Sequence, residues 1–269
     1  SRDNALSPEI VLQGWSARGE GGQKIQQYHL NGSLAEQIRI PTENAVPIGD
    51  ISPAEAGRWC AINTLLIAYG GLLSMDLKAG ERLLVSGATG NFGSSAVLAA
   101  LAMGAHKVIA PGRSERVLND LKKRFGSRVE TVRLTGTAEI DIAAMKHMAG
   151  GPIDAVLDFL PPSAQASVAR NAIMSVRPYG RAVLMGGVGM LGGDDLSLPY
   201  PWIMRNLITV KGQWMYEPSA VHTLCGLIRA GLLDLSHYDV TEFPLERVND
   251  SVAYAAKNSG PFKLTVVRP

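Results

Sequence analysis

Three regularly spaced glycines are the residues of this sequence best suited to bind a ligand. They lie in the segment Gly87-Ala88-Thr89-Gly90-Asn91-Phe92-Gly93, which follows one apolar stretch and opens another. Between a strand and a helix, such glycines permit a tight turn, close approach of the backbone to a pyrophosphate, and close helix–strand packing. The first N–H groups of the helix are free to bind phosphates. The spacing predicts a nicotinamide dinucleotide site on Gly87, Thr89, Gly90, Asn91, Phe92 and Gly93, with a ligand-free turn as the alternative.

The residues at the end of the next expected strand indicate which dinucleotide binds. A site for NAD(H) usually places a carboxylate there, where it accepts hydrogen bonds from the adenosine ribose. Here the sequence is Gly112-Arg113-Ser114, and the first carboxylate is Glu115. A guanidinium and a hydroxyl suit a dianionic 2′-phosphate. We therefore predict NADP(H), bound by Gly112, Arg113 and Ser114; the alternative is that Arg113 only caps a surface turn.

These segments belong to a regular alternation of expected strands and helices. Short apolar stretches predict buried strands at 82–86, 106–110, 129–134, 153–159, 181–185 and 207–214. Helices are predicted at 52–73, 92–103, 115–125, 140–148, 163–176, 218–230 and 245–258, with further strands at 33–40 and 262–267. Such alternation predicts an α/β fold with a doubly wound parallel sheet of the Rossmann type, covered by helices on both faces.

The composition is that of an ordinary globular protein. Of the 269 residues, 46% are hydrophobic and 19% are charged, and the formal net charge is +2. So small a charge argues against nucleic acid or an anionic membrane as partner. Two cysteines imply no disulfide framework, and Cys60 is expected to be a small buried hydrophobe. With no apolar run of roughly 18 residues and no signal-peptide core, a cytoplasmic protein is expected.

Further motifs surround the glycine turn. They are 32–36 followed by 40–47, Ser52-Pro53-Ala54-Glu55-Ala56 with Ala68-Tyr69, Leu77-Lys78-Ala79-Gly80-Glu81, and Val176-Arg177-Pro178-Tyr179-Gly180-Arg181 ahead of Met185-Gly186-Gly187. Taken in order over most of the chain, these motifs resemble the medium-chain dehydrogenase/reductase superfamily. Within it, the sequence is most similar to zinc-free alcohol dehydrogenase-like and quinone oxidoreductase-like members.

The resemblance implies a division of the chain into three parts. Residues 1–62 would be the remnant of a GroES-like β catalytic domain with its linking helix. Residues 63–239 would form the NADP-binding Rossmann domain, and 240–269 a helix and strand that return to the catalytic domain. Because members of the superfamily begin with a longer catalytic domain, the chain is expected to be a fragment or to lack a segment.

The resemblance also implies where the nicotinamide end of the site lies. Loops after the fourth, fifth and sixth strands would contact it, which adds Leu160, Pro161, Gly186, Gly187, Val188 and Trp214 to the cofactor-binding residues. Tyr69 and Asn63 are the candidate catalytic residues, as polar groups facing the cleft; alternatively, both pack the linking helix. Asn63 stands where zinc members carry their third ligand, and no cysteine or histidine pair has ligand spacing. No metal site is therefore predicted.

Together, these features predict an NADP(H)-dependent oxidoreductase that transfers hydride to or from a carbonyl, alcohol or conjugated enone without zinc. Two alternatives stay open: a non-catalytic NADP(H)-binding module, and a zinc alcohol dehydrogenase whose ligands lie in a missing segment. The expected partner is a small-molecule substrate. Superfamily members usually pair through an edge strand, here Leu207 to Trp214, so a homodimer is predicted.

Overall fold

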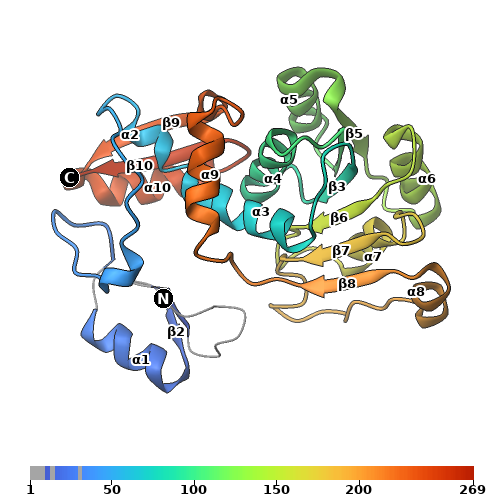
Figure 1. Ribbon diagram of the computed structural model, residues 1–269, viewed down its shortest axis with the longest axis horizontal. Helices are drawn as coiled ribbons and strands as arrows, with labels where there is room; N and C mark the ends of the chain where they lie inside the picture. Colours follow the sequence, from blue (N-terminus) through green and yellow to red (C-terminus); the bar gives the residue numbers. More distant parts are fainter. Residues whose placement is uncertain (1–9, 13–15, 30–31) are drawn as a thin grey trace.

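A six-stranded parallel sheet forms the centre of the computed structural model, which describes residues 10–12, 16–29 and 32–269 (Figure 1). The strand order is β5-β4-β3-β6-β7-β8. The order reverses between β3 and β6, which is the switch point where doubly wound sheets bind ligands at the carboxyl ends of their strands. The predicted doubly wound α/β fold is thus confirmed. The strands are β3 (Arg82–Ser86), β4 (Lys107–Gly112), β5 (Val129–Arg133), β6 (Ala155–Asp158), β7 (Arg181–Leu184) and β8 (Thr209–Gly212).

Helices cover both faces of the sheet because its central strands are apolar on both sides. In β3, Leu83 and Val85 belong to one core cluster and Leu84 to the other. Alternate residues of a strand face opposite sides, so each face requires its own cover. The first cluster packs against α3 (Ile62–Ser74), α4 (Asn91–Ala102), α5 (Glu115–Phe125) and α9 (Ala220–Arg229). The second packs against α6 (Ala138–Ala149), α7 (Ala166–Ile173) and α8 (Tyr200–Asn206).

A smaller unit lies beside the sheet, at the left of Figure 1. Its two parallel strands, β9 (Asp239–Pro244) and β10 (Lys263–Arg268), are connected through α10 (Val248–Asn258). Helix α2 (Ala56–Trp59) packs against β9. The N-terminal part holds β1 (Ile10–Leu12), β2 (Ser16–Arg18) and α1 (Gly19–Tyr28). Single 3-10 turns occur at Thr42–Asn44, Gly126–Arg128, Leu235–His237 and Leu245–Arg247.

The predicted strand at 33–40 is wrong. This segment contains bends and irregular backbone, and its apolar side chains Leu34 and Ile38 are 56% and 45% exposed. A strand needs a neighbour to bond its N–H and C=O groups. No strand pairs with this segment anywhere in the described ranges, so its partial alternation of apolar residues has no sheet to face.

The predicted single helix at 52–73 is divided into α2 and α3. The break falls at Cys60 and Ala61, where the N–H groups of Ala61, Asn63 and Thr64 donate to carbonyls three residues back. The hydroxyl of Thr64 also donates to the carbonyl of Ala61 at 3.1 Å. Such local bonding competes with the regular helical ladder and changes the direction of the chain. The result is that α2 belongs to the smaller unit, while α3 lies against the main sheet.

Five elements were not predicted: β1, β2, α1, α8 and β9. Helix α8 has seven residues with a proline in its first turn, so its apolar pattern is too short to recognise. Strand β9 pairs with β10, and the two are separated in the sequence by α10. No short sequence pattern near β9 indicates that pairing. In the described ranges, no helix is both long enough and apolar enough to cross a membrane.

Candidate functional site

The glycine turn joins β3 to α4 at the switch point of the sheet. Gly87 has a φ of +83°, a conformation that favours glycine. A Cβ at this position would lie 2.7 Å from the carbonyl oxygen of Phe159, just beyond β6. A Cβ on Gly93 would collide with the carbonyl oxygen of Gly87. The first and third glycines are therefore both required by the close approach of turn, helix and neighbouring strand.

The N-terminus of α4 presents free hydrogen-bond donors. Its N-cap is Gly90, which makes no side-chain capping bond. The first N–H bonded back into the helix is that of Ser94, which donates to the carbonyl of Gly90 at 2.9 Å. The N–H groups of 91–93 therefore have no acceptor in the part of the chain that the structure describes. Three donors at the positive end of a helix dipole form a cradle that fits a pyrophosphate.

The end of β4 lies against this cradle. A Cβ on Gly112 would lie 2.5 Å from Cγ2 of Thr89, so glycine at 112 allows the two predicted segments to touch. Arg113 is exposed and forms no hydrogen bond or ion pair with another described residue. The next carboxylate along the chain, Glu115, is paired instead with Arg133 at the end of β5. The guanidinium of Arg113 is thus available to an anionic ligand.

The loops after β6 and β7 continue the same row of contacts. A Cβ on Gly186 would lie 2.7 Å from the carbonyl oxygen of Leu160, and the N–H of Gly187 donates to that oxygen at 2.8 Å. The rings of Phe92 and Phe159 stack with their centroids 6.0 Å apart, which ties the start of α4 to the loop after β6. The predicted segments 87–93, 112–114, 160–161 and 186–187 therefore lie side by side along the carboxyl edge of the sheet.

A buried carboxyl group lies at the end of β6, beneath the loops that form this row of contacts. Asp158, the last residue of β6, is only 3% exposed, and a Cβ on Gly186 would collide with its Oδ2. Its Oδ1 is buried and has no hydrogen-bond partner among the described residues. Burial raises the pKa of Asp158 to about 6, opposed in part by hydrogen bonds from Ser86 and the backbone of Leu160. Our sequence analysis did not include this residue in the site.

Trp214 lies after the edge strand β8, beyond the loop that follows β7. Its side chain is 39% exposed, and the guanidinium carbon of Arg18 lies 5.4 Å from the centre of its ring. This cation–π contact links the N-terminal hairpin to the loop after β8. Val188 is half-buried in the loop after Gly187. The described contacts join neither Val188 nor Trp214 to the glycine turn.

The two candidate catalytic residues lie on different sides of α3. Tyr69 is 6% exposed and belongs to the first core cluster, whereas Asn63 is exposed near the start of the helix. The structure therefore does not bring the two side chains together at one point. Their catalytic roles stay predictions.

Two glycines of α3 were missed in the sequence analysis. A Cβ on Gly70 would lie 2.6 Å from Cβ of Tyr216, and a Cβ on Gly71 would lie 2.5 Å from the sulfur of Met185. These positions let α3 approach the loops after β8 and β7 more closely than larger residues would allow. A glycine pair inside an otherwise apolar helix is the sequence signal that indicates such an approach.

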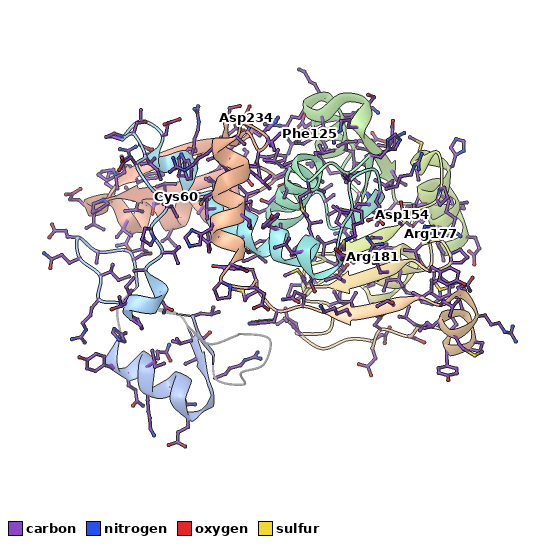
Figure 2. All side chains as sticks on the ribbon, viewed as in Figure 1. Cys60, Phe125, Asp154, Arg177, Arg181 and Asp234 are labelled. Carbon is purple, nitrogen blue, oxygen red and sulfur yellow. The ribbon has the colours of Figure 1, made fainter. Side chains whose placement is uncertain are left out.

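The expectation that Cys60 is buried is wrong. The residue is exposed at the break between α2 and α3, in the smaller unit (Figure 2). Its thiol is partly covered, and this burial is the main cause that raises its pKa, helped by the nearby carboxylate of Glu242. In the described ranges, no three histidine, cysteine, aspartate or glutamate side chains converge as metal ligands.

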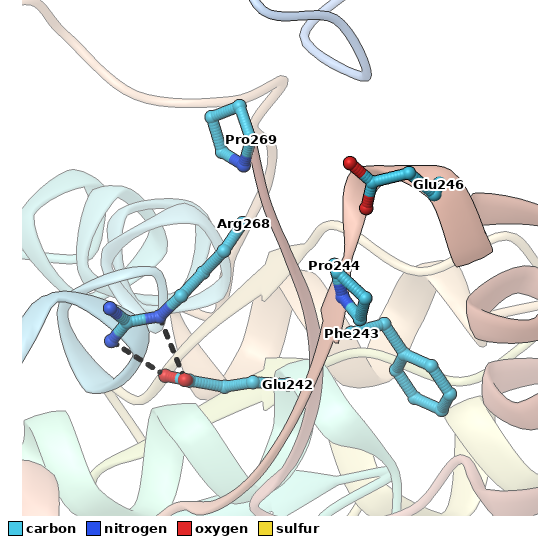
Figure 3. Close-up of a pocket in the computed structure, with 6 residues that line it drawn as sticks. All are labelled: Glu242, Phe243, Pro244, Glu246, Arg268 and Pro269. Atoms are coloured by element: carbon cyan, nitrogen blue, oxygen red, sulfur yellow. Dashed lines mark hydrogen bonds and ion pairs between the residues drawn. The ribbon is translucent and has the colours of Figure 1, made fainter.

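A cavity of about 370 Å³ lies away from the glycine turn, at the end of the β9–β10 pair (Figure 3). The ion pair between Nε of Arg268 and Oε2 of Glu242, 2.7 Å apart, forms part of its wall. None of the predicted cofactor-binding residues lines this cavity. We therefore place the candidate site at the carboxyl edge of the main sheet, where shape and unpaired donors coincide, and assign no function to the cavity. Its lining residues are Glu242, Phe243, Pro244, Glu246, Arg268 and Pro269.

Comparison with protein families agrees with this geometry. Residues 92–230, just over half of the chain, match the family model described as zinc-binding dehydrogenase. The match begins within the glycine turn and ends after α9, so it covers most of the main sheet. The chain therefore belongs to the zinc-binding dehydrogenase family, within the medium-chain dehydrogenase/reductase superfamily. The resemblance inferred from the motifs is confirmed.

Individual proteins show how far the similarity extends. Alcohol dehydrogenase 1 of Neurospora crassa is 24% identical over 254 residues, which are 92% of this chain and 64% of that protein. A probable NADPH-dependent quinone reductase, tdiC of Emericella nidulans, is 30% identical over 216 residues, which are 68% of this chain and 60% of that protein. The chain thus spans less than two thirds of the length of these curated relatives.

Solved structures share the fold. The short chain alcohol dehydrogenase rspB of E. coli CFT073, crystallised with cofactor NADH, matches with a TM-score of 0.61 and 17% identity. The match covers 77% of this chain and 58% of that one. At this identity the likeness shows the fold alone.

Proposed function

We propose that this chain binds NADP(H) and acts as an oxidoreductase that transfers hydride to or from a carbonyl, alcohol or conjugated enone. The observation that carries the proposal is the carboxyl edge of the sheet at its switch point. There, among the described residues, three N–H groups at the start of α4 have no acceptor and Arg113 has no partner, while Gly87 and Gly93 allow the turn to pack closely on neighbouring backbone. Family membership supports the oxidoreductase class.

The described residues fit the cofactor in three parts. The N–H groups of 91–93 would hold the pyrophosphate, and Gly87 and Gly93 permit the tight turn and close backbone packing that position these N–H groups. Segment 112–114 would receive the adenosine, while 160–161, 186–188 and Trp214 would contact the nicotinamide end. When bound, the cofactor supplies or accepts the hydride, and the protein orients it and excludes water.

A preference for NADP(H) over NAD(H) is the finer part of the proposal. A ribose 2′-phosphate carries two negative charges, and Arg113 offers a planar donor group that has no partner among the residues the structure describes. Glu115 is paired with Arg133 rather than with Arg113, which leaves the guanidinium of Arg113 to the phosphate. The quinone reductase of Emericella nidulans is described as NADPH-dependent, whereas the E. coli neighbour was crystallised with NADH.

We further propose that the reaction proceeds without zinc, with Tyr69 and Asn63 as the candidate polar groups. The proposal rests on the resemblance described above, which implies that Asn63 stands where zinc-containing members carry their third ligand. A turnover assay with quinones, enones and aldehydes tests the activity. NADPH binding without turnover would instead favour a non-catalytic module. Stoichiometric zinc in the purified full-length protein would contradict the zinc-free mechanism.

The cofactor preference has a direct test in the variant Arg113→Ala. We expect the dissociation constant for NADPH to rise about tenfold, because one charge-assisted contact contributes roughly 1.4 kcal/mol. The constant for NADH should change less than about twofold, because NADH has no group for Arg113 to bind. Fluorescence titration of both dinucleotides measures this. Equal affinity of the wild-type chain for NADH and NADPH would contradict the preference.

We also propose a homodimer through the edge strand β8 and a three-part domain organisation. Leu207 is 55% and Met204 is 55% exposed beside this strand, and no described strand covers its outer edge. Residues 1–62 and 240–269 would belong with the catalytic domain, and 63–239 with the cofactor. The β9–β10 unit with α2 supports this division. A monomeric mass in solution scattering would contradict the dimer.

A further inference from the structure

The end of β5 lies beside the residues assigned to the adenosine phosphate. In the parallel pairing of β4 with β5, Arg133 stands opposite Gly112. The N–H of Leu134 donates to the carbonyl of Gly112 at 2.9 Å, which holds the two strand ends together. Arg133 is therefore fixed, by backbone pairing, one strand away from Gly112 and Arg113.

The side chain of Arg133 points to the α5 side of the sheet. Val129 and Val132 of the same strand belong to opposite core clusters. Because side chains alternate along a strand, Arg133 shares the face of Val129, which is the face covered by α4 and α5. On that face it meets Glu115, the first residue of α5 and the neighbour of Ser114.

The ion pair between Arg133 and Glu115 is isolated and accessible. The two side chains are 58% and 66% exposed, and neither bonds to any other residue in the described part of the chain. Exposed ion pairs are weak because water and salt screen them. A phosphate with two negative charges therefore competes effectively with the single carboxylate of Glu115 for this guanidinium.

We propose that Arg133 is a second specificity-determining residue for the 2′-phosphate, and that Glu115 restrains it when no phosphate is present. The proposal rests on the NADP(H) function proposed above. When NADH binds, the Arg133–Glu115 ion pair stays intact and contributes nothing to binding. With NADPH, Arg133 turns from Glu115 toward the phosphate beside Arg113, and the remaining charge of Glu115 weakens binding by repulsion.

Titration of the whole 269-residue chain with NADPH and with NADH tests this assignment. For Arg133→Ala, we expect the NADPH dissociation constant to rise about tenfold, with NADH binding changed less than about twofold. For Arg133→Lys, which keeps the charge, the rise should be about threefold or less. For Glu115→Gln, NADPH should bind about threefold more tightly, because the repelling charge is gone, and NADH should be unaffected.

Arg116→Ala is the matched control. Arg116 is the next residue of α5, its side chain is 83% exposed, and it lies 3.7 Å from Asp120 rather than beside Gly112. Its removal lowers the net charge equally and should leave the preference unchanged. NADH binding in every variant reports that the fold is intact.

The outcomes separate the two proposals. If Arg113→Ala weakens NADPH binding while Arg133→Ala and Glu115→Gln do not alter it, the role of Arg133 is overturned and the NADP(H) assignment stands. If the wild-type chain binds both dinucleotides equally and no variant changes this, the NADP(H) assignment fails and the role of Arg133 fails with it. An equal effect of Arg116→Ala would show a general charge effect and would also overturn the role of Arg133.

Discussion

The two edges of the main sheet differ in how their polar groups are satisfied. At the amino edge, Asp154 accepts hydrogen bonds from the backbone of Arg82 at 2.8 Å and from Nε of Arg177 at 2.6 Å (Figure 2). Arg181 bonds the carbonyl of Met75 and pairs with Glu81. Charges and backbone groups at this edge are thus matched within the chain.

At the carboxyl edge, polar groups are left without partners. Three N–H groups at the start of α4, the guanidinium of Arg113, and the buried oxygens Oδ1 of Asn91 and Oδ1 of Asp158 have no acceptor or donor in the described ranges. Unpaired buried polar groups lower stability, so they persist where something other than stability is selected. Polar groups at the amino edge therefore stabilise the sheet, whereas those at the carboxyl edge are available to the ligand proposed above.

The largest effect on this contrast should come from closing the carboxyl edge with a methyl group. Gly87→Ala places a Cβ against the backbone of Phe159 and Leu160, at a φ of +83°. We expect a loss of roughly 3 kcal/mol of stability and at least a hundredfold weaker NADPH binding, because the turn must move away from the cradle. Thermal unfolding and fluorescence titration measure the two effects.

Gly126→Ala is the matched control for that variant. Gly126 also has a positive φ, +59°, but nothing lies within 4 Å of its Cβ position. The substitution should cost about 1 kcal/mol through backbone strain alone and leave NADPH binding unchanged. If Gly126→Ala and Gly87→Ala weaken binding equally, the close approach at Gly87 is not what forms the site.

The buried carboxyl of Asp158 predicts a pH-dependent stability. Because burial raises its pKa from the ordinary 3.8 to about 6, the folded chain holds the proton more tightly than the unfolded chain does. The stabilising contribution of protonated Asp158 to the free energy of unfolding is complete below about pH 4 and is lost as the pH rises through 6. The rise in pKa corresponds to about 3 kcal/mol.

Asp158→Asn should remove this dependence. The variant should gain up to about 3 kcal/mol relative to the wild type between pH 4 and pH 8, measured as urea midpoints across that range. If the difference in unfolding free energy between the two proteins is constant over that range, Asp158 has the same pKa in the folded and unfolded states. Asp158 would then no longer distinguish the carboxyl edge from the amino edge.

Opening the amino edge should affect stability and leave ligand binding alone. Asp154→Ala leaves the Arg177 guanidinium and the N–H of Arg82 without their partner, and we expect a loss of about 2 kcal/mol. The affinity for NADPH should stay within about twofold of the wild type. A larger change in affinity would mean that the two edges are coupled through the strands.

The local features of the fold were predictable from the sequence. Apolar strands, helix starts and the three glycines of 87–93 are signals within a few residues of each other, and they predicted the sheet and the position of the turn between β3 and α4. The position of Gly112 at the end of β4 likewise follows from the local pattern, and its role in binding stays a prediction. Such features succeed because backbone conformation and burial follow from short-range patterns.

The remaining features depend on contacts between distant segments. Asp158 meets Gly186 only when β6 and β7 pair, and Arg133 meets Glu115 only when β5 lies beside β4. The wrong strand at 33–40 fails for the same reason, because alternation shows which residues can face a sheet and not whether a neighbouring strand exists. The break at Cys60 depends on a local hydrogen bond from Thr64 that helix propensity does not include.

The central claim is that the carboxyl edge, and not the amino edge, binds the dinucleotide. Addition of NADPH to the ¹⁵N-labelled chain, followed by amide NMR, tests it most directly. We predict saturable shifts of the backbone N–H signals of Asn91, Phe92 and Gly93, with those of Arg82 and Arg177 unchanged. Saturable binding that moves the amino-edge signals and leaves 91–93 in place would contradict the account.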